Sequence, residues 1–268
     1  MKGGPGVYLE SPQNPKIHRW SQLKSKKGRL TEGAFLVEGV RLVDDLLRSS
    51  FEVEAVLWDV GTDNLPEDLT ETAQLRGVPL IEVAPRAFAA VADTVTPQGV
   101  IAVAKLPQTG VEPSSVAFGL VLDNLRDPGN VGTLVRSADA FGVDLVLCGS
   151  GTVDPYSPKV VRASMGGTFR VPVESKATTV FLSAWRDAWP DGKVVLADAK
   201  GQVDCDQFDF RGPVLIVIGS EATGASAEAE ALATDTLQIP MTGMADSLNA
   251  AIAGSVLLYE ASRQRRSR

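Results

Sequence analysis

Hydrophobic and polar residues alternate in two different ways along the chain, and the change divides it into two parts. In the first part, short stretches of alternating apolar and polar positions predict half-buried strands between helices. One of these stretches, residues 33–43, predicts a short strand that runs directly into a helix. The others lie at 53–58, 78–83 and 99–105. This pattern is typical of a small α/β domain that ends near residue 106.

In the second part, nearly continuous apolar segments alternate with longer helical stretches. Strands are expected at 118–122, 145–148, 194–197, 214–218 and 236–239. Because such strands are buried on both faces, they predict a mostly parallel sheet with helices on both sides. In sheets of this kind, ligands bind at the carboxyl ends of the strands.

A polar stretch containing proline and glycine, residues 107–115, separates the two parts and is typical of a linker. We predict a smaller N-terminal α/β domain at 1–107, including a flexible start, a linker at 108–116 and a C-terminal α/β domain at 117–268. The 268 residues, of which 44% are hydrophobic, are enough to form two such cores.

Charge is unevenly distributed along the chain. The formal net charge of −7 by itself argues against a nucleic-acid partner, because proteins that bind polyanions are usually basic. Residues 1–50, however, contain nine lysines and arginines against five acids, whereas residues 51–100 contain two against nine. Six of the basic residues fall between Lys16 and Arg29 without an acid among them. An acidic protein can therefore still present a basic surface to RNA.

Histidine and cysteine are too scarce for several kinds of chemistry. The single histidine, His18, argues against Ser-His-Asp catalysis and against paired-histidine metal sites. Cys148 and Cys205 lie far apart without metal-ligand spacing, so neither a disulfide framework nor a zinc finger is expected. The N-terminus lacks a signal-peptide core and no apolar run is long enough to span a bilayer. We therefore expect a cytoplasmic protein with no membrane partner.

The first segment with candidate chemistry, residues 122–142, predicts a strand end, a Pro-Gly turn and a helix. Asn130 is placed to cap that helix. Arg136 follows Gly132 by one helical turn, and its side chain leans back toward the helix N-terminus, where phosphate groups bind. The alternative is that Asn130 is only a cap and Arg136 only a solvated charge.

A second segment, residues 214–226, predicts an aliphatic strand that opens into a loop of small residues. Small side chains let the backbone approach a ligand, and Glu221 offers a carboxylate at the rim. The segment lacks the lysine of a P-loop and the glycine spacing of a dinucleotide-binding loop. The alternative is a simple turn in which Gly224 supplies the backbone angles and Ser226 caps the next helix.

The third segment, residues 237–260, predicts a strand end, a loop and a helix rich in alanine and glycine. Small residues on a helix permit close packing against another backbone or a bound ligand. Ser247 and Asn249 place polar groups in this otherwise apolar region. The alternative is that Ser247 caps the helix and Asn249 is a buried, hydrogen-bonded amide.

Taken together and in this order, the three segments resemble the three sequence motifs of the SpoU (TrmH) family of SPOUT-class RNA 2′-O-ribose methyltransferases. The matching residues are Asn130 with Arg136, the glycine-bounded loop Gly219-Ser220-Glu221-x2-Gly224, and Ile239-Pro240-Met241 followed by Ser247-Leu248-Asn249. The N-terminal part resembles the RNA substrate-binding domain that family members carry, in residues 14–16, 35–43 and 94–100.

That resemblance implies a fold, a cofactor and an assembly. The C-terminal domain would be a SPOUT domain whose chain end forms a deep trefoil knot. S-adenosylmethionine would be the cofactor, no metal would be needed, and the protein would be a homodimer with active sites at its interface. The residues implied in cofactor binding are Leu196, Ala197, Gly219, Ile239, Met241 and Leu248.

The resemblance also implies catalytic roles. Arg136 would contact the RNA phosphate next to the reactive ribose, meet the partner subunit's cofactor and help to activate the 2′-hydroxyl. The residues that would orient Arg136, the ribose and the loop backbone are Asn130, Glu221, Ser247 and Asn249.

The basic N-terminal run is the surface expected to bind RNA, because phosphate contacts supply affinity that is independent of sequence. The expected RNA-binding residues are Lys16, Arg19, Lys24, Lys26, Lys27, Arg29 and Arg41, with Arg162 and Ser164 added by the resemblance. The C-terminal arginines either add affinity or form a disordered, solvated tail: Arg263, Arg265, Arg266 and Arg268.

The N-terminal resemblance favours ribosomal RNA, and specifically 23S rRNA, over tRNA as the substrate. Two other functions stay open: the same chemistry on tRNA, and a non-catalytic RNA-binding protein with this fold. A nucleotide-dependent oxidoreductase would need a glycine fingerprint after Leu122, where the sequence reads Asp-Asn-Leu-Arg-Asp-Pro-Gly-Asn.

Overall fold

The computed structural model describes residues 7–62, 65–108, 110–221 and 223–266, and the chain divides into two compact units. Unit 1 comprises Met1–Gln108 together with Tyr156–Phe169, and unit 2 comprises Thr109–Pro155 and Arg170–Arg268. The segment 156–169, which the sequence places in the C-terminal domain, is therefore grouped with the N-terminal one. Residues 1–6 of the predicted flexible start lie outside the described residues.

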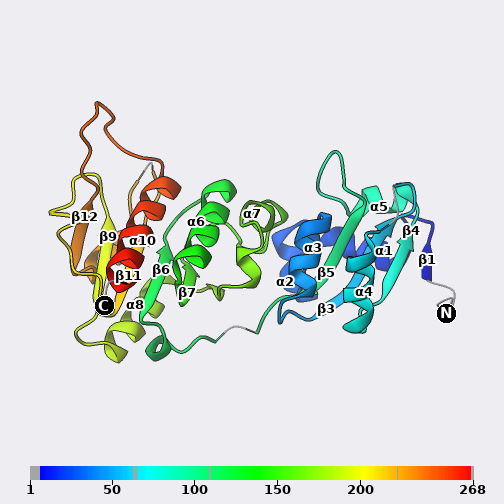
Figure 1. Ribbon diagram of the computed structural model, residues 1–268, viewed down its shortest axis with the longest axis horizontal. Coiled ribbons are helices and arrows are strands. Elements are labelled where there is room, and N and C mark those ends of the chain that lie inside the picture. The colour runs from blue at the N-terminus through cyan, green and yellow to red at the C-terminus, as the bar shows by residue number, and fades with distance from the viewer. Residues whose placement is uncertain (1–6, 63–64, 109, 222, 267–268) are drawn as a thin grey trace. The chain divides into compact units, whose positions relative to one another are not determined.

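Unit 1 is built on a mixed five-stranded sheet with the strand order β1-β4-β3-β5-β2 (Figure 1). Its strands are β1 (Val7–Leu9), β2 (Ala34–Glu38), β3 (Val53–Asp59), β4 (Leu80–Val83) and β5 (Val100–Lys105). Strand β5 is antiparallel to both β2 and β3, whereas β4 is parallel to β3 and β1. Successive side chains of β2 enter opposite cores, Phe35 and Val37 on one face and Leu36 on the other.

Helices cover both faces of this sheet. They are α1 (Pro15–Gln22), α2 (Lys26–Glu32), α3 (Val40–Leu47), α4 (Glu67–Leu75), α5 (Pro85–Val91), α7 (Pro158–Ala163) and the single 3-10 turn η2 (Gly167–Phe169). Tyr156, Val161 and Phe169 are buried in the core on the Phe35 side, and the Tyr156 ring lies 5.0 Å from that of Phe35. These buried contacts explain why the segment 156–169 belongs to unit 1.

Unit 2 contains a seven-stranded sheet in the order β10-β12-β9-β11-β6-β7-β8, and every neighbouring pair is parallel. The strands are β6 (Phe118–Leu122), β7 (Leu145–Cys148), β8 (Val173–Ser175), β9 (Lys193–Ala197), β10 (Val203–Asp204), β11 (Val214–Ile218) and β12 (Asp235–Gln238). The five predicted strands are all present within one residue of their expected bounds, which confirms the parallel α/β prediction. The edge strands β8 and β10 have only three and two residues and no long apolar run to reveal them.

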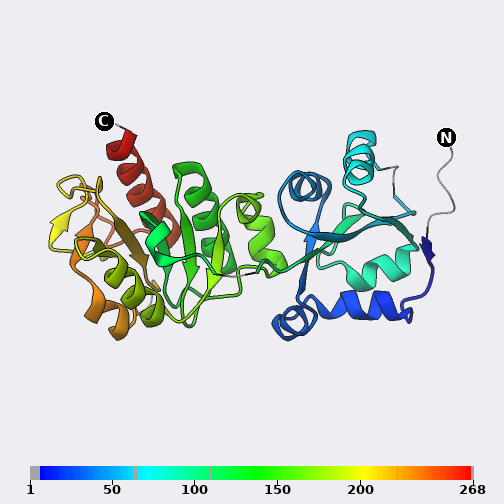
Figure 2. The ribbon, with the colours of Figure 1, turned by 90° about the horizontal axis from the view of Figure 1, so that it is seen from below.

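Helices lie on both faces of this sheet, as strands that are buried on both sides require. On one face, α6 (Pro128–Phe141) lies beside α10 (Ala250–Arg266) (Figure 1, Figure 2). The other face carries α8 (Thr178–Ala188), which packs against α9 (Ala227–Leu232) and the 3-10 turn η1 (Pro113–Ser115). A Cβ on Gly254 would lie 2.4 Å from Leu134 and 3.2 Å from Ile218, so this glycine lets α10 approach both α6 and β11. The trefoil knot stays a prediction, because strand order and helix packing do not define a knot.

Most of the predicted linker is packed on unit 2. The buried carboxylate of Glu174 accepts hydrogen bonds from the backbone N–H groups of Gly110 (2.7 Å) and Val111 (2.5 Å). The indole N–H of Trp185 donates to the carbonyl of Val116 at 2.7 Å. Residues 110–116 therefore belong to the folded unit.

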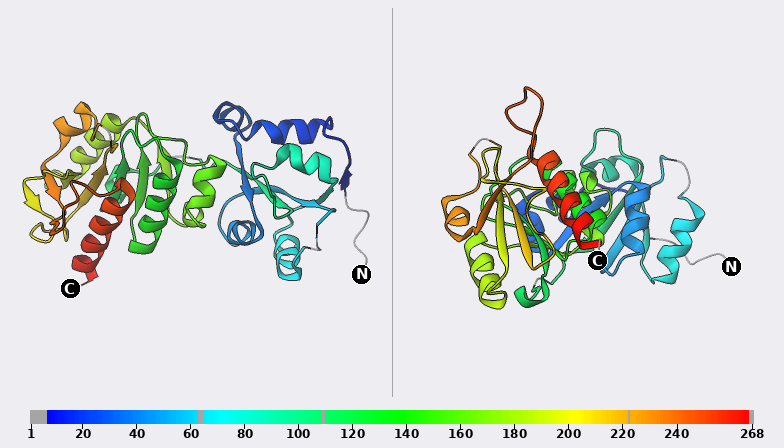
Figure 3. Two further views of the ribbon diagram at one scale, coloured as in Figure 1. Left: turned by 90° about the horizontal axis from the view of Figure 1, so that it is seen from above. Right: turned by 60° about the vertical axis from the view of Figure 1, so that its left-hand side comes forward.

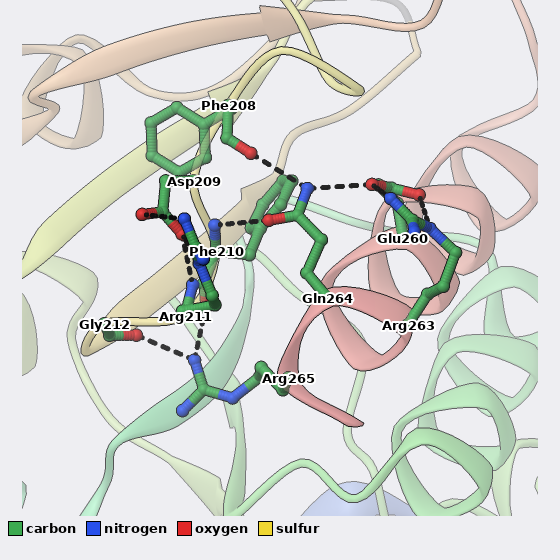
Figure 4. A network of polar contacts seen from close by, with 9 residues as sticks. All are labelled: Phe208, Asp209, Phe210, Arg211, Gly212, Glu260, Arg263, Gln264 and Arg265. Carbon is green, nitrogen blue, oxygen red and sulfur yellow. Dashed lines mark hydrogen bonds and ion pairs between the residues drawn. The ribbon is translucent and has the colours of Figure 1, made fainter. Parts of the chain in front are cut away.

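The last turns of α10 are anchored by backbone groups of the loop that precedes β11 (Figure 4). Gln264 accepts a hydrogen bond from the N–H of Phe210 (3.1 Å) and donates to the carbonyl of Phe208 (2.9 Å). Arg265 donates to the carbonyls of Phe210 (2.5 Å) and Gly212 (2.7 Å). An arginine that satisfies two carbonyls is a structural group rather than a solvated charge.

The predicted C-terminal tail is therefore part of a helix as far as it is described. Arg263 forms an ion pair with Glu260 at 2.7 Å, and Arg266 donates to the carbonyl of Ser262 on the same helix. These contacts correct the expectation of a disordered tail at these positions. Arg268 lies outside the described residues.

Candidate active site

A cavity of about 300 Å³ lies at the carboxyl ends of β9, β11 and β12 in unit 2. This is the size of pocket that holds a small molecule, and it is at the sheet edge where parallel sheets bind ligands. Part of its wall comes from residues 239–249, which form a projecting loop between β12 and α10 (Figure 3). The structure gathers all six residues implied in cofactor binding around this cavity: Leu196, Ala197, Gly219, Ile239, Met241 and Leu248.

The loop after β11 is folded tightly back on itself. Ser220 and Gly224 exchange two backbone hydrogen bonds, of 2.9 and 2.8 Å. A Cβ on Gly219 would lie 2.3 Å from the backbone nitrogen of Ala225, so only glycine fits at this position. Gly224 has a φ of +70° and Ser226 caps α9, as expected for a turn. The loop is therefore both a turn and a wall of the cavity.

Asn130, Glu221 and Asn249 bring the three predicted segments together in one hydrogen-bond cluster. Oε1 of Glu221 accepts hydrogen bonds from Nδ2 of Asn130 (2.6 Å) and Nδ2 of Asn249 (3.1 Å). The same oxygen accepts from the N–H of Ala250 at 3.3 Å, the first residue of α10. A carboxylate is favourable there because the N-terminus of a helix carries partial positive charge. The cluster joins α6, the β11 loop and the start of α10.

Asn130 is available for this cluster because it does not cap α6, contrary to the prediction. The helix begins earlier, at Pro128, and the carboxylate of Asp127 accepts the N–H of Asn130 at 2.8 Å as the cap. Proline at the first helical position favours this early start. The Asp-Pro pair before Gly129 is the sequence signal that identifies the true helix start.

The cap of α10 also differs from the alternative stated for residues 237–260, in which Ser247 caps the helix and Asn249 is buried. Oδ1 of Asn249 accepts from the N–H groups of Ala251 (2.9 Å) and Ile252 (3.2 Å), so Asn249 is the cap. Its side chain is exposed rather than buried. Ser247 is left to line the cavity.

Arg136 lies on the exposed face of α6 and does not line the cavity of its own chain. In the described part of the chain, its guanidinium has no hydrogen bond or ion pair. An arginine held on a rigid helix without a carboxylate partner is able to bind an anion from solution.

Several cavity-lining residues were not indicated by the sequence motifs. Ala250, Ala253 and Leu257 of α10 face the cavity at helical spacing, so their periodicity could have identified them. Asp198 and Glu230 add two carboxylates to the lining, and no local pattern marks them.

Metal and thiol chemistry have little support in the described residues. No group of three His, Cys, Asp or Glu side chains in this part of the chain could hold a metal ion. Burial raises the pKa of the Cys148 thiol to about 12, and burial likewise raises the pKa of Cys205. Neither cysteine therefore supplies a thiolate nucleophile near neutral pH.

Several of the candidate RNA-binding residues of unit 1 have side chains that are exposed to solvent. Lys16, Lys26, Lys27 and Arg41 all project into solvent. Lys24 is also exposed, although its ammonium group donates to a backbone carbonyl at 2.8 Å. Lys26 and Lys27 begin α2 and are the best placed of the group for phosphate contacts.

Two other candidates, Arg29 and Ser164, are buried, which corrects their assignment to the RNA surface, and a third, Arg162, is paired within unit 1. Arg29 is only 3% exposed and donates to the carbonyls of Leu23 and Lys24 after α1. Ser164 is completely buried and bonds to Thr168. Arg162 is half-buried and forms an ion pair with Asp93, which also belongs to unit 1, at 2.8 Å. The donors of Arg29 and Ser164 are buried and already satisfied, so they cannot reach a phosphate, whereas Nη1 of Arg162 has no hydrogen-bond partner within the described residues.

Arg19 is likewise neutralised within unit 1. Its guanidinium forms ion pairs with Glu32 at 2.6 Å and Glu54 at 2.5 Å. Partial burial acts to raise the carboxyl pKa of Glu54, but the hydrogen bonds and charge of Arg19 outweigh it and the pKa is lowered. Arg19 is therefore a structural cation.

The lowered pKa of Glu54 in its ion pair with Arg19 makes the stability of unit 1 depend on pH. A carboxyl group with a lowered folded-state pKa stabilises the fold above its unfolded pKa, and that contribution disappears as the pH falls through the folded pKa. Urea unfolding should show that Glu54→Gln costs stability at about pH 7 and costs progressively less toward about pH 3. An equal cost at both pH values would contradict this role for Glu54.

Comparisons with known proteins identify the family. The SpoU rRNA Methylase family matches residues 117–259, and the MRM3-like substrate binding domain matches residues 14–102. The 23S rRNA (guanosine(2553)-2'-O)-methyltransferase RlmP of Bacillus subtilis (strain 168) is 32% identical over 252 residues, which cover 94% of this chain and 97% of that protein. The 23S rRNA (uridine(2479)-2'-O)-methyltransferase of Streptomyces viridochromogenes is 33% identical over 270 residues, which cover 97% of this chain and 94% of that protein.

A solved structure is similar over the same length. The crystal structure of the SpoU methyltransferase AviRb from Streptomyces viridochromogenes in complex with the cofactor AdoMet has a TM-score of 0.85 and 32% sequence identity. The similarity covers 95% of this chain and 99% of that one. Together with the family match, this agreement over nearly the full length shows that the chain belongs to the SpoU rRNA methylase family.

Proposed function

We propose that this protein transfers a methyl group from S-adenosylmethionine to the 2′-hydroxyl of a ribose in 23S rRNA. The observation that carries the proposal is the cavity at the strand ends, whose lining residue Glu221 joins the three motif segments through its hydrogen bonds with Asn130 and Asn249. The two relatives named for 23S rRNA resemble nearly the whole chain, including unit 1. This supports ribosomal RNA over tRNA as the substrate.

The residues around the cavity suit S-adenosylmethionine. Leu196, Ile218 and Leu248 offer an apolar surface for an adenine ring, and the bare backbone at Gly219 permits close approach. The charged residues of the described lining are all carboxylates, which suits a sulfonium cation. When bound, the cofactor supplies a methyl group attached to a positively charged sulfur. Once the methyl group is transferred, the remainder of the cofactor leaves as a neutral thioether.

The chain's own residues have to make the ribose hydroxyl reactive. A ribose hydroxyl keeps its proton at neutral pH, so it must be positioned in line with the methyl group and its developing charge must be stabilised. Arg136 binds the neighbouring RNA phosphate and supplies that positive charge. A guanidinium is a poor base because it keeps its proton in proteins, so the role of Arg136 is positioning and electrostatics rather than proton removal. Asn130, Glu221 and Asn249 hold α6 against the start of α10 and so orient Arg136, while Ser247 presents a hydroxyl to the cavity.

A homodimer explains why Arg136 does not line the cavity of its own chain. Helix α10 carries Ile252 (51% exposed), Val256 (36%) and Tyr259 (50%) on one face. Such a row of exposed apolar side chains is stabilised when a partner buries it. In the dimer, Arg136 acts on the cofactor held by the partner subunit. Sedimentation velocity should therefore show a dimer. A stable monomer would contradict both the homodimer and the action of Arg136 across the dimer interface.

Calorimetry with pure protein and S-adenosylmethionine tests the cofactor, and mapping of ribose methylation in a deletion strain tests the substrate. One 2′-O-methyl group should disappear from 23S rRNA. A loss from tRNA instead would establish the tRNA alternative. Absence of cofactor binding would favour a non-catalytic RNA-binding protein.

The double substitution of Lys26 and Lys27 by alanine tests the RNA surface of unit 1. Because each phosphate contact releases counterions, the slope of log affinity against log salt should fall by about two and RNA affinity by about tenfold. Lys176→Ala, which removes an exposed lysine of unit 2, is the matched control and should bind normally. An unchanged salt slope in the double variant would remove this surface from RNA binding.

A further inference from the structure

Asp123 is a completely buried carboxylate directly after β6, and the reaction described above does not use it. Its Oδ1 accepts a hydrogen bond from the hydroxyl of Thr178 at 2.6 Å, and its Oδ2 accepts one from the backbone N–H of Ser226 at 2.7 Å. Thr178 is the first residue of α8 and Ser226 caps α9. Asp123 has no ion pair in the described part of the chain, so the hydroxyl of Thr178 and the N–H of Ser226 stabilise its burial.

These contacts tie both ends of one loop to a single residue. The backbone N–H of Asp123 donates to the carbonyl of Ile218 at 2.9 Å, immediately before the loop begins. The side chain holds the N–H of Ser226, where the loop ends. Between these points lie Gly219, which lines the cavity, and Glu221, which binds Asn130. Asp123 therefore holds both ends of the loop, one through its backbone N–H and the other through its carboxylate.

Asp123 also begins the segment that carries the first motif. The next residue, Asn124, has a φ of +57° and its N–H donates to the carbonyl of Ser150 at 3.1 Å. The hydroxyl of Thr178 in turn accepts the N–H of Ser150 at 3.3 Å. One partly buried network thus connects the segment that leads to Asn130 with the loop that carries Glu221.

We propose that Asp123 is a positioning residue that holds the described residues of the β11 loop, 219–221 and 223–226, as a preformed wall of the cofactor cavity. This inference rests on the function proposed above. Without the carboxylate, the N–H of Ser226 and the hydroxyl of Thr178 lose their buried acceptor, and the loop moves to satisfy them. A loop that must then be ordered by the ligand binds that ligand more weakly.

Substitutions of Asp123 test this role in the full-length protein. Asp123→Ala should weaken binding of S-adenosylmethionine by about tenfold, measured by calorimetry, while the KM for RNA stays within about twofold. Asp123→Asn keeps an acceptor for the N–H of Ser226 and a donor for the hydroxyl of Thr178. It should therefore restore cofactor affinity to within about threefold of the wild type.

Glu174→Ala is the matched control for lost stability. Glu174 is also a buried carboxylate of unit 2 that accepts two backbone N–H bonds, but it does not line the cavity. Its replacement should lower the melting temperature and leave cofactor affinity unchanged. Normal binding by Asp123→Ala, or equal weakening in Glu174→Ala, would overturn the proposal.

Hydrogen exchange of the protein without ligand separates this inference from the proposed function. Asp123→Ala should speed exchange in residues 219–221 and 223–226, and Asp123→Asn should restore protection. If Asp123→Ala does not fold, Thr178→Val serves in its place, with Thr178→Ser as its rescue. Absence of cofactor binding by the wild type would defeat the proposed function alone, whereas unchanged exchange in the loop would defeat the role of Asp123.

Discussion

Replacing Arg136 by alanine should lower the rate of ribose methylation by about 10²- to 10³-fold and leave the affinity for S-adenosylmethionine within about threefold. Arg136 is exposed, does not line the cavity of its own chain and has no partner in the described residues. In the mechanism proposed above, its loss removes positive charge from the transition state without disturbing the fold or the cavity. Single-turnover methyl transfer to 23S rRNA measures the rate, and calorimetry measures the affinity.

Arg186→Ala is the matched control for this substitution. Arg186 is an exposed arginine on α8 that does not line the cavity, so its loss should leave the rate unchanged. Full activity in Arg136→Ala would remove Arg136 from catalysis. A large loss of cofactor affinity would instead make Arg136 a cofactor-binding residue.

Gly219→Ala should weaken cofactor binding by about 100-fold and abolish methyl transfer. The added Cβ would lie 2.3 Å from the backbone of Gly224 and Ala225, and backbone atoms cannot move aside as the end of a side chain can. The loop must shift, and with it Glu221, which joins the other two motif segments. Calorimetry measures the affinity, and RNA binding should persist because unit 1 is unchanged.

Gly212→Ala is the control for introducing a methyl group at a glycine in the same unit. A Cβ on Gly212 has no neighbour within 4 Å, so cofactor affinity should match the wild type. If Gly219→Ala also bound normally, the β11 loop would not be the wall of the cofactor site.

Mixing the two inactive variants tests whether Arg136 acts across a dimer. A mixed dimer combines the intact Arg136 of the Gly219→Ala chain with the intact cavity of the Arg136→Ala chain, so one of its two sites is complete. After random reassociation, about a quarter of wild-type activity should return. No recovery despite formation of mixed dimers would place Arg136 at the cavity of its own chain.

The position of the cavity was largely predictable from the sequence, although each of its signals was weak alone. The aliphatic run 214–218 and the small residues after it identified a strand end with a ligand-accessible loop, and the structure has the cavity there. Parallel strands place their carboxyl ends at one edge of a sheet, so residues at 196, 219 and 239 could be expected to meet. The hydrogen bonds among Asn130, Glu221 and Asn249 were not predictable in detail, because their geometry depends on how α6 and α10 pack.

The basic N-terminal surface was less predictable. Charge density alone suggested that all the lysines and arginines from Lys16 to Arg29 face RNA. Arg29 instead satisfies carbonyls at the end of α1, and Arg19 pairs with Glu54, which lies on β3 far along the chain. A sequence pattern records charge, whereas exposure depends on which acceptors the fold brings near.

By itself, the amino-acid sequence determined five of the seven strands of the parallel sheet, the α/β class and the family motifs, because these depend on neighbours close in the chain and on periodicity. Only the tertiary structure decided that residues 156–169 join unit 1, since their place depends on burying Tyr156 and Phe169 against Phe35 and its neighbours. It also decided the role of Asp123. Whether a carboxylate is a solvated charge or a buried anchor depends on donors such as Thr178 and Ser226, which are distant in sequence and adjacent only in the fold.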